Sequence, residues 1–205
     1  MKKNIIIMAL VALTLASCEE QSEKDTSYAP PQDLALNSDI MTPEVLWSMN
    51  RLGEYAVSPD GKHVVYNLTY FNIPENKSKT DIYIIDIDGN NNRCLTKSFS
   101  NELSPTWNKD GSKILFMCAD SGDMQVWEMN PDGSERKQVS FVEGGITGFK
   151  YSPDESQLLF TAEVKLKDNV ADIYPDLPLS SGRVNNDLMY RHWDQWVDTY
   201  SHIFV

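Results

Sequence analysis

The return of one short turn sequence at a nearly fixed spacing limits the folds open to this chain more than any other feature. Ser-Pro-Asp-Gly at residues 58–61, Asn-Lys-Asp-Gly at 108–111 and Ser-Pro-Asp-Glu at 152–155 each precede a short apolar run. The copies begin 50 and 44 residues apart. A second pair of turns ends at Gly89 and Gly133, again 44 residues apart. Such a period indicates similar supersecondary units that stack on one another.

Each residue type in the turn has a physical role. Proline fixes φ, aspartate bonds back to the following backbone, and glycine takes the left-handed conformation that returns the chain antiparallel. Glu155 stands where the first two copies have Gly61 and Gly111. Because a side chain in that conformation costs about 1 kcal/mol, the sequence predicts a different type of turn in the third copy.

Short runs rich in β-branched and aromatic residues lie between the turns and predict strands. They are 55–57, 64–68, 82–87, 114–118, 125–129, 149–151 and 158–162. Runs such as Ile-Tyr-Ile-Ile at 82–85 are apolar on both faces, which indicates sheets buried between neighbours. A period in the mid-forties with four short strands per unit is typical of a propeller blade. The sequence therefore predicts an all-β fold, an incomplete β-propeller.

The third unit departs from the period, because residues 165–201 form an insertion before the next run with a strand-like composition, at 202–205. About two and a half four-stranded blades are therefore expected. A closed propeller needs at least four blades of roughly 40–45 residues each, and open blade faces are prone to aggregate. We therefore expect this chain to be part of a longer protein.

A short helix is expected before the first blade, since Thr42 can cap a helix and Pro43 suits its first turn. Gly53 fits the position after the end of that helix. The predicted propeller domain therefore covers residues 41–205, with the insertion at about 165–201.

The N-terminus has the pattern of an export signal. Lys2 and Lys3 precede an apolar run at 5–15 that is too short to span a bilayer. Leu-Ala-Ser-Cys at 15–18 resembles the lipobox of bacterial lipoproteins. That resemblance implies a signal peptide at 1–17 and an acylated Cys18 that anchors the chain to a membrane. The alternative is an ordinary secretory signal with an incidental cysteine, and both place the mature chain outside the cytoplasm.

Residues 18–40 are polar and acidic, contain Pro30 and Pro31, and predict a flexible tether. Glu19 and Glu20 resemble the surface-export signals of some Gram-negative lipoproteins. The expected location is the cell envelope, with the lipid-anchored chain either periplasmic or on the outer-membrane surface.

The formal charge of −12 disfavours contact with phosphate backbones, so no nucleic-acid partner is expected. None of the three histidines stands at a metal-ligand spacing, and we expect neither a metal ion nor a cofactor. Cys94 and Cys118 are either small buried apolar residues or a disulfide, which export would permit.

The repeats resemble TolB-type and WD-like propellers. The lead-in at 41–46 resembles the entry to the propeller of prolyl oligopeptidase-family enzymes. The segment Tyr-Arg-His-Trp-Asp-Gln-Trp-Val-Asp at 190–198, followed by 201–205, resembles the insertion of the dipeptidyl-peptidase V and acylaminoacyl-peptidase branch. The resemblance covers residues 41–205. It implies an N-terminal propeller that shapes the substrate cavity of a serine hydrolase domain acting on peptide N-termini.

In that family the nucleophile lies in a Gly-x-Ser-x-Gly elbow. No serine of this chain has glycine both two residues before it and two residues after it. No catalytic residue can therefore be assigned, and the chain alone is expected to hydrolyse nothing. We interpret it as the substrate-gating propeller of an exported serine peptidase whose partners are peptides. One alternative is a non-enzymatic TolB-type envelope propeller that binds protein partners. Another is an inert relic of a broken gene. The sequence does not indicate which oligomeric state the protein has.

The densest aromatic and charged cluster of the chain lies in the insertion. It consists of Arg191, His192, Trp193, Asp194, Trp196 and Asp198. Aromatic rings beside carboxylates suit a peptide ammonium, so these residues are candidates for substrate binding. The alternative is that the two tryptophans pack the insertion onto the blade while Arg191 pairs with an acid.

Overall fold

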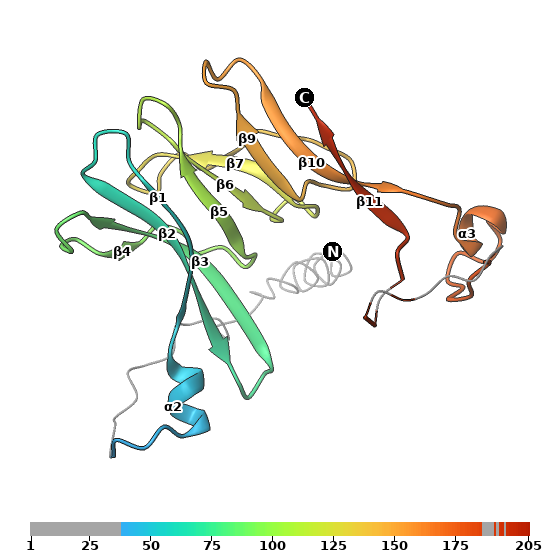
Figure 1. Ribbon diagram of the computed structural model, residues 1–205, viewed down its shortest axis with the longest axis horizontal. Helices are drawn as coiled ribbons and strands as arrows, with labels where there is room; N and C mark the ends of the chain where they lie inside the picture. Colours follow the sequence, from blue (N-terminus) through green and yellow to red (C-terminus); the bar gives the residue numbers. More distant parts are fainter. Residues whose placement is uncertain (1–37, 186–190, 192, 195) are drawn as a thin grey trace, which may run out of the picture.

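Three antiparallel sheets lie side by side in the computed structural model, which describes residues 38–185, 191, 193–194 and 196–205 (Figure 1). The first sheet contains β1 (Arg51–Val57), β2 (His63–Asn72), β3 (Lys77–Asp86) and β4 (Arg93–Cys94). The second contains β5 (Glu102–Trp107), β6 (Ile114–Cys118), β7 (Gln125–Met129) and β8 (Lys137–Gln138). The third contains β9 (Gly148–Tyr151), β10 (Leu158–Lys165) and β11 (Thr199–Phe204). The predicted incomplete propeller is confirmed.

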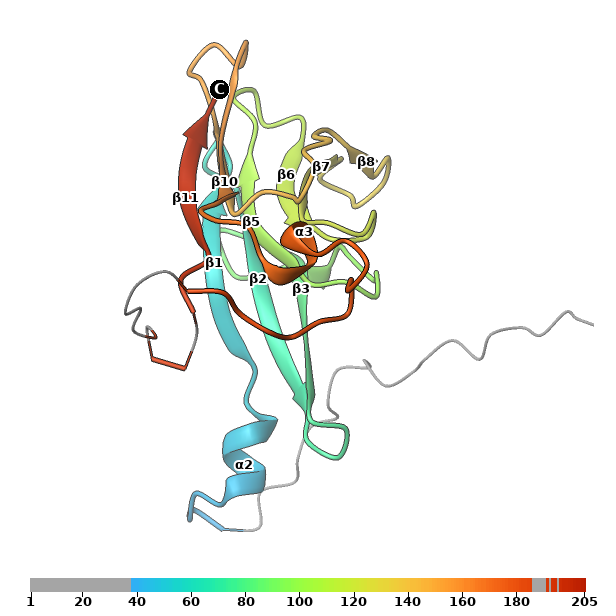
Figure 2. The same cartoon turned by 90° about the vertical axis from the view of Figure 1, so that its right-hand side faces the viewer.

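The expected helix precedes the first blade as α2 (Pro43–Ser48) and lies beyond the N-terminal end of β1 (Figure 2). Thr42 caps it by accepting a hydrogen bond from the backbone N–H of Val45. The prediction that Gly53 follows the helix end is wrong, because the helix ends at Ser48, the next residue Met49 is extended, and Gly53 lies within β1. Among the described residues, no helix has the length and apolar character needed to cross a membrane.

The repeated turns have the predicted chemistry. In the first copy Asp60 accepts hydrogen bonds from the Ser58 hydroxyl and the Lys62 N–H at 2.7 and 3.1 Å. The N–H of Gly61 donates to the carbonyl of Ser58 at 2.9 Å. These bonds reverse the chain from β1 into β2 without help from distant residues.

The third turn does not differ from the others, so the prediction made from Glu155 is wrong. Glu155 takes φ of 57°, close to the 71° of Gly61, and its N–H donates to the Ser152 carbonyl at 2.8 Å. Its carboxylate also accepts a hydrogen bond from the backbone N–H of Lys109, at 2.6 Å, in the turn of the neighbouring blade. That contact between blades compensates for the strain of a side chain in the left-handed region.

Apolar side chains fill the space between consecutive sheets. Between the first two sheets the buried apolar residues are Val65, Ile82, Ile84, Ile114, Phe116, Cys118 and Met129. A second cluster, with Met117, Val126 and Ile146 at its centre, lies between the second and third sheets. All five residues of β6 are buried, because the middle blade is covered on both faces as predicted. Cys94 and Cys118 are free thiols in this structure.

Charged side chains are also buried between the first two blades. The Lys79 ammonium lies 2.6 Å from the Asp81 carboxylate and 3.0 Å from that of Glu102, and the three side chains are 2%, 7% and 0% exposed. Arg136 donates to Glu102 at 3.0 Å and pairs with Asp120 at 2.8 Å. We call these five residues the ionic cluster.

Glu102 is the residue of the ionic cluster on which both cations converge. Burial raises the pKa of its carboxyl group, while the Ser98 hydroxyl and the charges of Lys79 and Arg136 act in the opposite direction. A buried ion pair of this kind adds little net stability over an apolar pair, but removing one partner is strongly destabilising. The ionic cluster therefore favours one alignment of β3 with β5 over others.

Lys79→Met removes the shared ammonium and leaves the Asp81 and Glu102 carboxylates without it. Because an uncompensated buried charge results, we expect the free energy of unfolding to fall by about 3–5 kcal/mol. Urea denaturation followed by circular dichroism measures the change. Lys62→Met is the matched control, since Lys62 pairs with Asp60 at 74% and 51% side-chain exposure and should contribute almost nothing. Equal, small losses in both variants would contradict the role given to Lys79.

Candidate functional site

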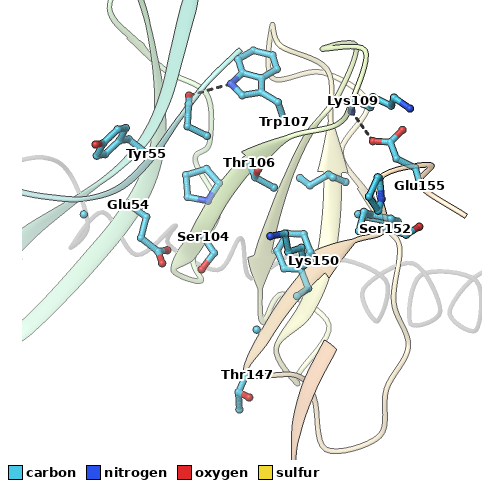
Figure 3. A pocket seen from close by; sticks show the side chains of 18 residues that line it. Glu54, Tyr55, Ser104, Thr106, Trp107, Lys109, Thr147, Lys150, Ser152 and Glu155 are labelled. Carbon is cyan, nitrogen blue, oxygen red and sulfur yellow. Dashed lines mark hydrogen bonds between the residues drawn. The ribbon is translucent and has the colours of Figure 1, made fainter. Parts of the chain in front are cut away.

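The first strands of the three blades, β1, β5 and β9, line a cavity of about 930 Å³ together with the turn that follows β9 (Figure 3). Two hydrogen bonds join its walls. The Trp107 indole N–H donates to the carbonyl of Ala56 at 3.2 Å, which ties β5 to β1. The bond from the Lys109 N–H to Glu155 ties the second blade to the third. The cavity is therefore a property of all three blades and of no single sheet.

Charged, hydroxyl and aromatic side chains are mixed on the wall of this cavity. Glu54, Lys109, Lys150 and Glu155 supply the charges. Burial and nearby carboxylates raise the pKa of the Tyr151 phenol, so this ring stays a neutral hydrogen-bonding group. Of the described residues that line the cavity, none is a histidine or a cysteine. The arrangement can bind a polar ligand, but it offers no nucleophile paired with a base.

Gly53 sets the path of β1 along the cavity. A Cβ atom at this position would stand 2.0 Å from the Oδ1 atom of Asn67 on β2. Asn67 is itself buried, so its amide has little room to move away. The next residue, Glu54, is thereby fixed on the cavity side of the strand (Figure 3).

The structure brings together part of the cluster predicted in the insertion. The guanidinium groups of Arg183 and Arg191 lie 4.7 and 5.0 Å from the centre of the Trp196 ring. Arg183 also pairs with Asp198, and this hydrogen bond lowers the pKa of the Asp198 carboxyl. Arg183 was missed from the sequence, where an isolated arginine in a polar stretch gives no signal. These contacts join Trp196 and Asp198 to two arginines of the insertion.

The two other candidates that the structure describes, Trp193 and Asp194, make no such contacts. Trp193 is 90% exposed, and Asp194 is exposed as well. His192 lies outside the described residues. None of the described candidates lines the cavity between the blades. Substrate binding by the predicted set stays a prediction for all of its members: Arg191, His192, Trp193, Asp194, Trp196 and Asp198. Within the described ranges no three His, Cys, Asp or Glu side chains gather as a metal site would require.

Comparison with known proteins places the chain among propellers. Residues 48–183 match the family model described as the TolB beta propeller domain. Over 203 residues the chain is 43% identical to a dipeptidyl-peptidase 5 of Porphyromonas endodontalis, covering 99% of this chain and 29% of that one. It is 46% identical over 165 residues to the dipeptidyl-peptidase 5 of Porphyromonas gingivalis, covering 80% and 24%. The chain thus spans less than a third of the length of these relatives.

Solved structures agree on the fold. An acylaminoacyl peptidase in complex with Z-Gly-Gly-Phe-chloromethyl ketone superposes with a TM-score of 0.55 and 17% identity. The match covers 77% of this chain and 24% of that one. At this identity the similarity concerns the arrangement of blades alone.

Gly53→Ala tests the close approach of β1 to Asn67. The added methyl group overpacks a buried contact, so we expect the free energy of unfolding to fall by about 1–3 kcal/mol. The same substitution in an Asn67→Ala background should lower the free energy of unfolding by less, because the obstructing amide is gone. A double-mutant cycle by urea denaturation measures this coupling. An identical cost in both backgrounds would contradict the contact.

Proposed function

Because the chain belongs to the TolB β-propeller domain family, we propose that it is the propeller portion of an exported serine peptidase acting on peptide N-termini. The observation that carries this proposal is its similarity to two enzymes named dipeptidyl-peptidase 5 over most of its length. Since the chain spans under a third of those relatives, the hydrolytic residues of such a peptidase would lie in sequence beyond the region compared. This chain would contribute substrate binding and access.

The cavity between the blades supports that division of roles. It has charged and hydroxyl groups suited to a peptide, and its described lining residues include no nucleophile with a neighbouring base. The insertion adds exposed groups, Trp193 and Asp194, that a peptide ammonium could reach. The aromatic face and carboxylate of these two residues fit the chemistry of that ligand.

The proposal includes anchoring in the cell envelope through an acylated Cys18. The short apolar run before Leu-Ala-Ser-Cys at 15–18, and the polar residues after it, support this assignment. An anchored propeller would hold its peptidase where exogenous peptides arrive.

The native protein, isolated from its source cells with an antibody against residues 41–205, tests the enzymatic part. We expect a protein several hundred residues longer than this chain, by analogy with relatives of which it covers under a third. It should release dipeptides from a peptide with a free N-terminus and lose this activity after treatment with a fluorophosphonate, because the nucleophilic serine oxygen attacks phosphorus, displaces fluoride and stays blocked as a phosphonyl ester.

Two outcomes would overturn the enzymatic proposal. One is a native protein of the size of this chain without peptidase activity. The other is dipeptide release that fluorophosphonate leaves unchanged. The first would favour a propeller that only binds partners.

Cys18→Ser tests the anchor in the full 205-residue chain expressed in a Gram-negative host with radiolabelled palmitate. The unmodified chain should carry label and sediment with membranes, because several acyl chains anchor a protein stably. Cys18→Ser should lose both properties, and the control Cys94→Ser should keep them. Label that persists in Cys18→Ser would refute lipidation at this residue.

A further inference from the structure

Two β-bulges occur at equivalent places in the first strands of consecutive blades. In β1 the register with β2 shifts between Leu52 and Tyr55, so that Gly53 and Glu54 form the bulge. In β5 the register with β6 shifts between Leu103 and Thr106, which places Ser104 and Pro105 in the second bulge. Bulges redirect side chains and are frequent beside binding sites. All four bulge residues line the cavity.

The local backbone at both bulges is constrained. A Cβ atom on Gly53 would overlap the buried side chain of Asn67. Ser104 has φ of 51°, in the left-handed region that is unfavourable for a residue with a Cβ atom. Strained conformations of this kind persist where the surrounding structure imposes them, and they cluster at binding sites. The bulges therefore give Glu54 and Ser104 defined positions on the cavity wall.

Opposite charges face this cavity from two strands that are not neighbours. Glu54 on β1 and Lys150 on β9 are both exposed, and Ser104 on β5 lies between them (Figure 3). Neither charged group has a hydrogen-bond or ion-pair partner among the described residues. By contrast, the ionic cluster pairs all of its charges within the protein. Glu54 and Lys150 are thus available to a ligand.

We propose that the cavity binds short peptides with two free ends, such as the dipeptides that the proposed peptidase would release. Lys150 takes the carboxylate, Glu54 takes the ammonium, and the Ser104 hydroxyl bonds to the amide between them. The assignment follows from charge, because each end of a zwitterionic peptide needs an opposite charge or several hydrogen bonds. A volume of about 930 Å³ is ample for such a ligand. The choice of peptides as ligand class rests on the proposed function.

The test uses the full 205-residue chain, labelled with nitrogen-15 and titrated with four peptides in an NMR experiment. They are Ala-Ala, its N-acetyl form, its C-terminal amide, and the form blocked at both ends. Ala-Ala should shift the amide signals of β1, β5 and β9 and bind most tightly. Each blocked end should weaken binding about fivefold, the effect expected of one exposed ion pair, and the doubly blocked peptide should bind weakest.

Two variants show which side chain binds which end of the peptide. Glu54→Gln should abolish the difference between Ala-Ala and its N-acetyl form, and Lys150→Met the difference between Ala-Ala and its amide. Glu143→Gln and Lys97→Met, at exposed positions outside the cavity lining, are the controls and should leave the ranking unchanged. Equal binding of all four peptides, or site variants that behave like the controls, would overturn the proposal. The experiment needs no hydrolysis, so its outcome is independent of whether the native protein is a peptidase.

Discussion

The buried contact between Lys79 and Glu102 fixes how the first two blades meet. The ammonium comes from the third strand of one blade and the carboxylate from the first residue of the next, 3.0 Å apart and almost fully buried. Apolar packing between the same sheets supplies most of the stabilisation, but it is non-directional. The ionic cluster adds direction, because a shifted alignment would leave a buried charge unpaired.

The cavity between the blades depends on the position of β5, because residues of this strand form part of its wall. With β5 held against the first blade, its bulge and the bulge of β1 line the same cavity, and Trp107 can bond to Ala56. Glu155 then joins the third blade through Lys109. The wall that results carries charged, hydroxyl and aromatic side chains from all three blades.

The blades and their turns could be predicted because their signals are local, from Asp60 and Gly61 to the apolar runs. Strand β5 was not among the predicted runs, since Ser104 and Pro105 interrupt its apolar pattern. The ionic cluster was also missed: lysine and glutamate usually lie at the surface, and Lys79 and Glu102 are 23 positions apart. In the insertion, neighbours in sequence such as Trp193 and Trp196 proved to have different surroundings, because Arg183, 15 positions before Asp198, organises only part of the cluster.

Hydrogen exchange of the full chain, followed amide by amide, tests most directly whether the ionic cluster makes one unit of the first two blades. The role given to the ionic cluster requires that the amides of β3, β5 and β6 share the largest free energy of opening, whereas those of β11 exchange faster. It would be contradicted if β3 opened at a distinctly lower free energy than β5 and β6. The first two blades would then open independently, and the cavity wall would not be held by the contact between them.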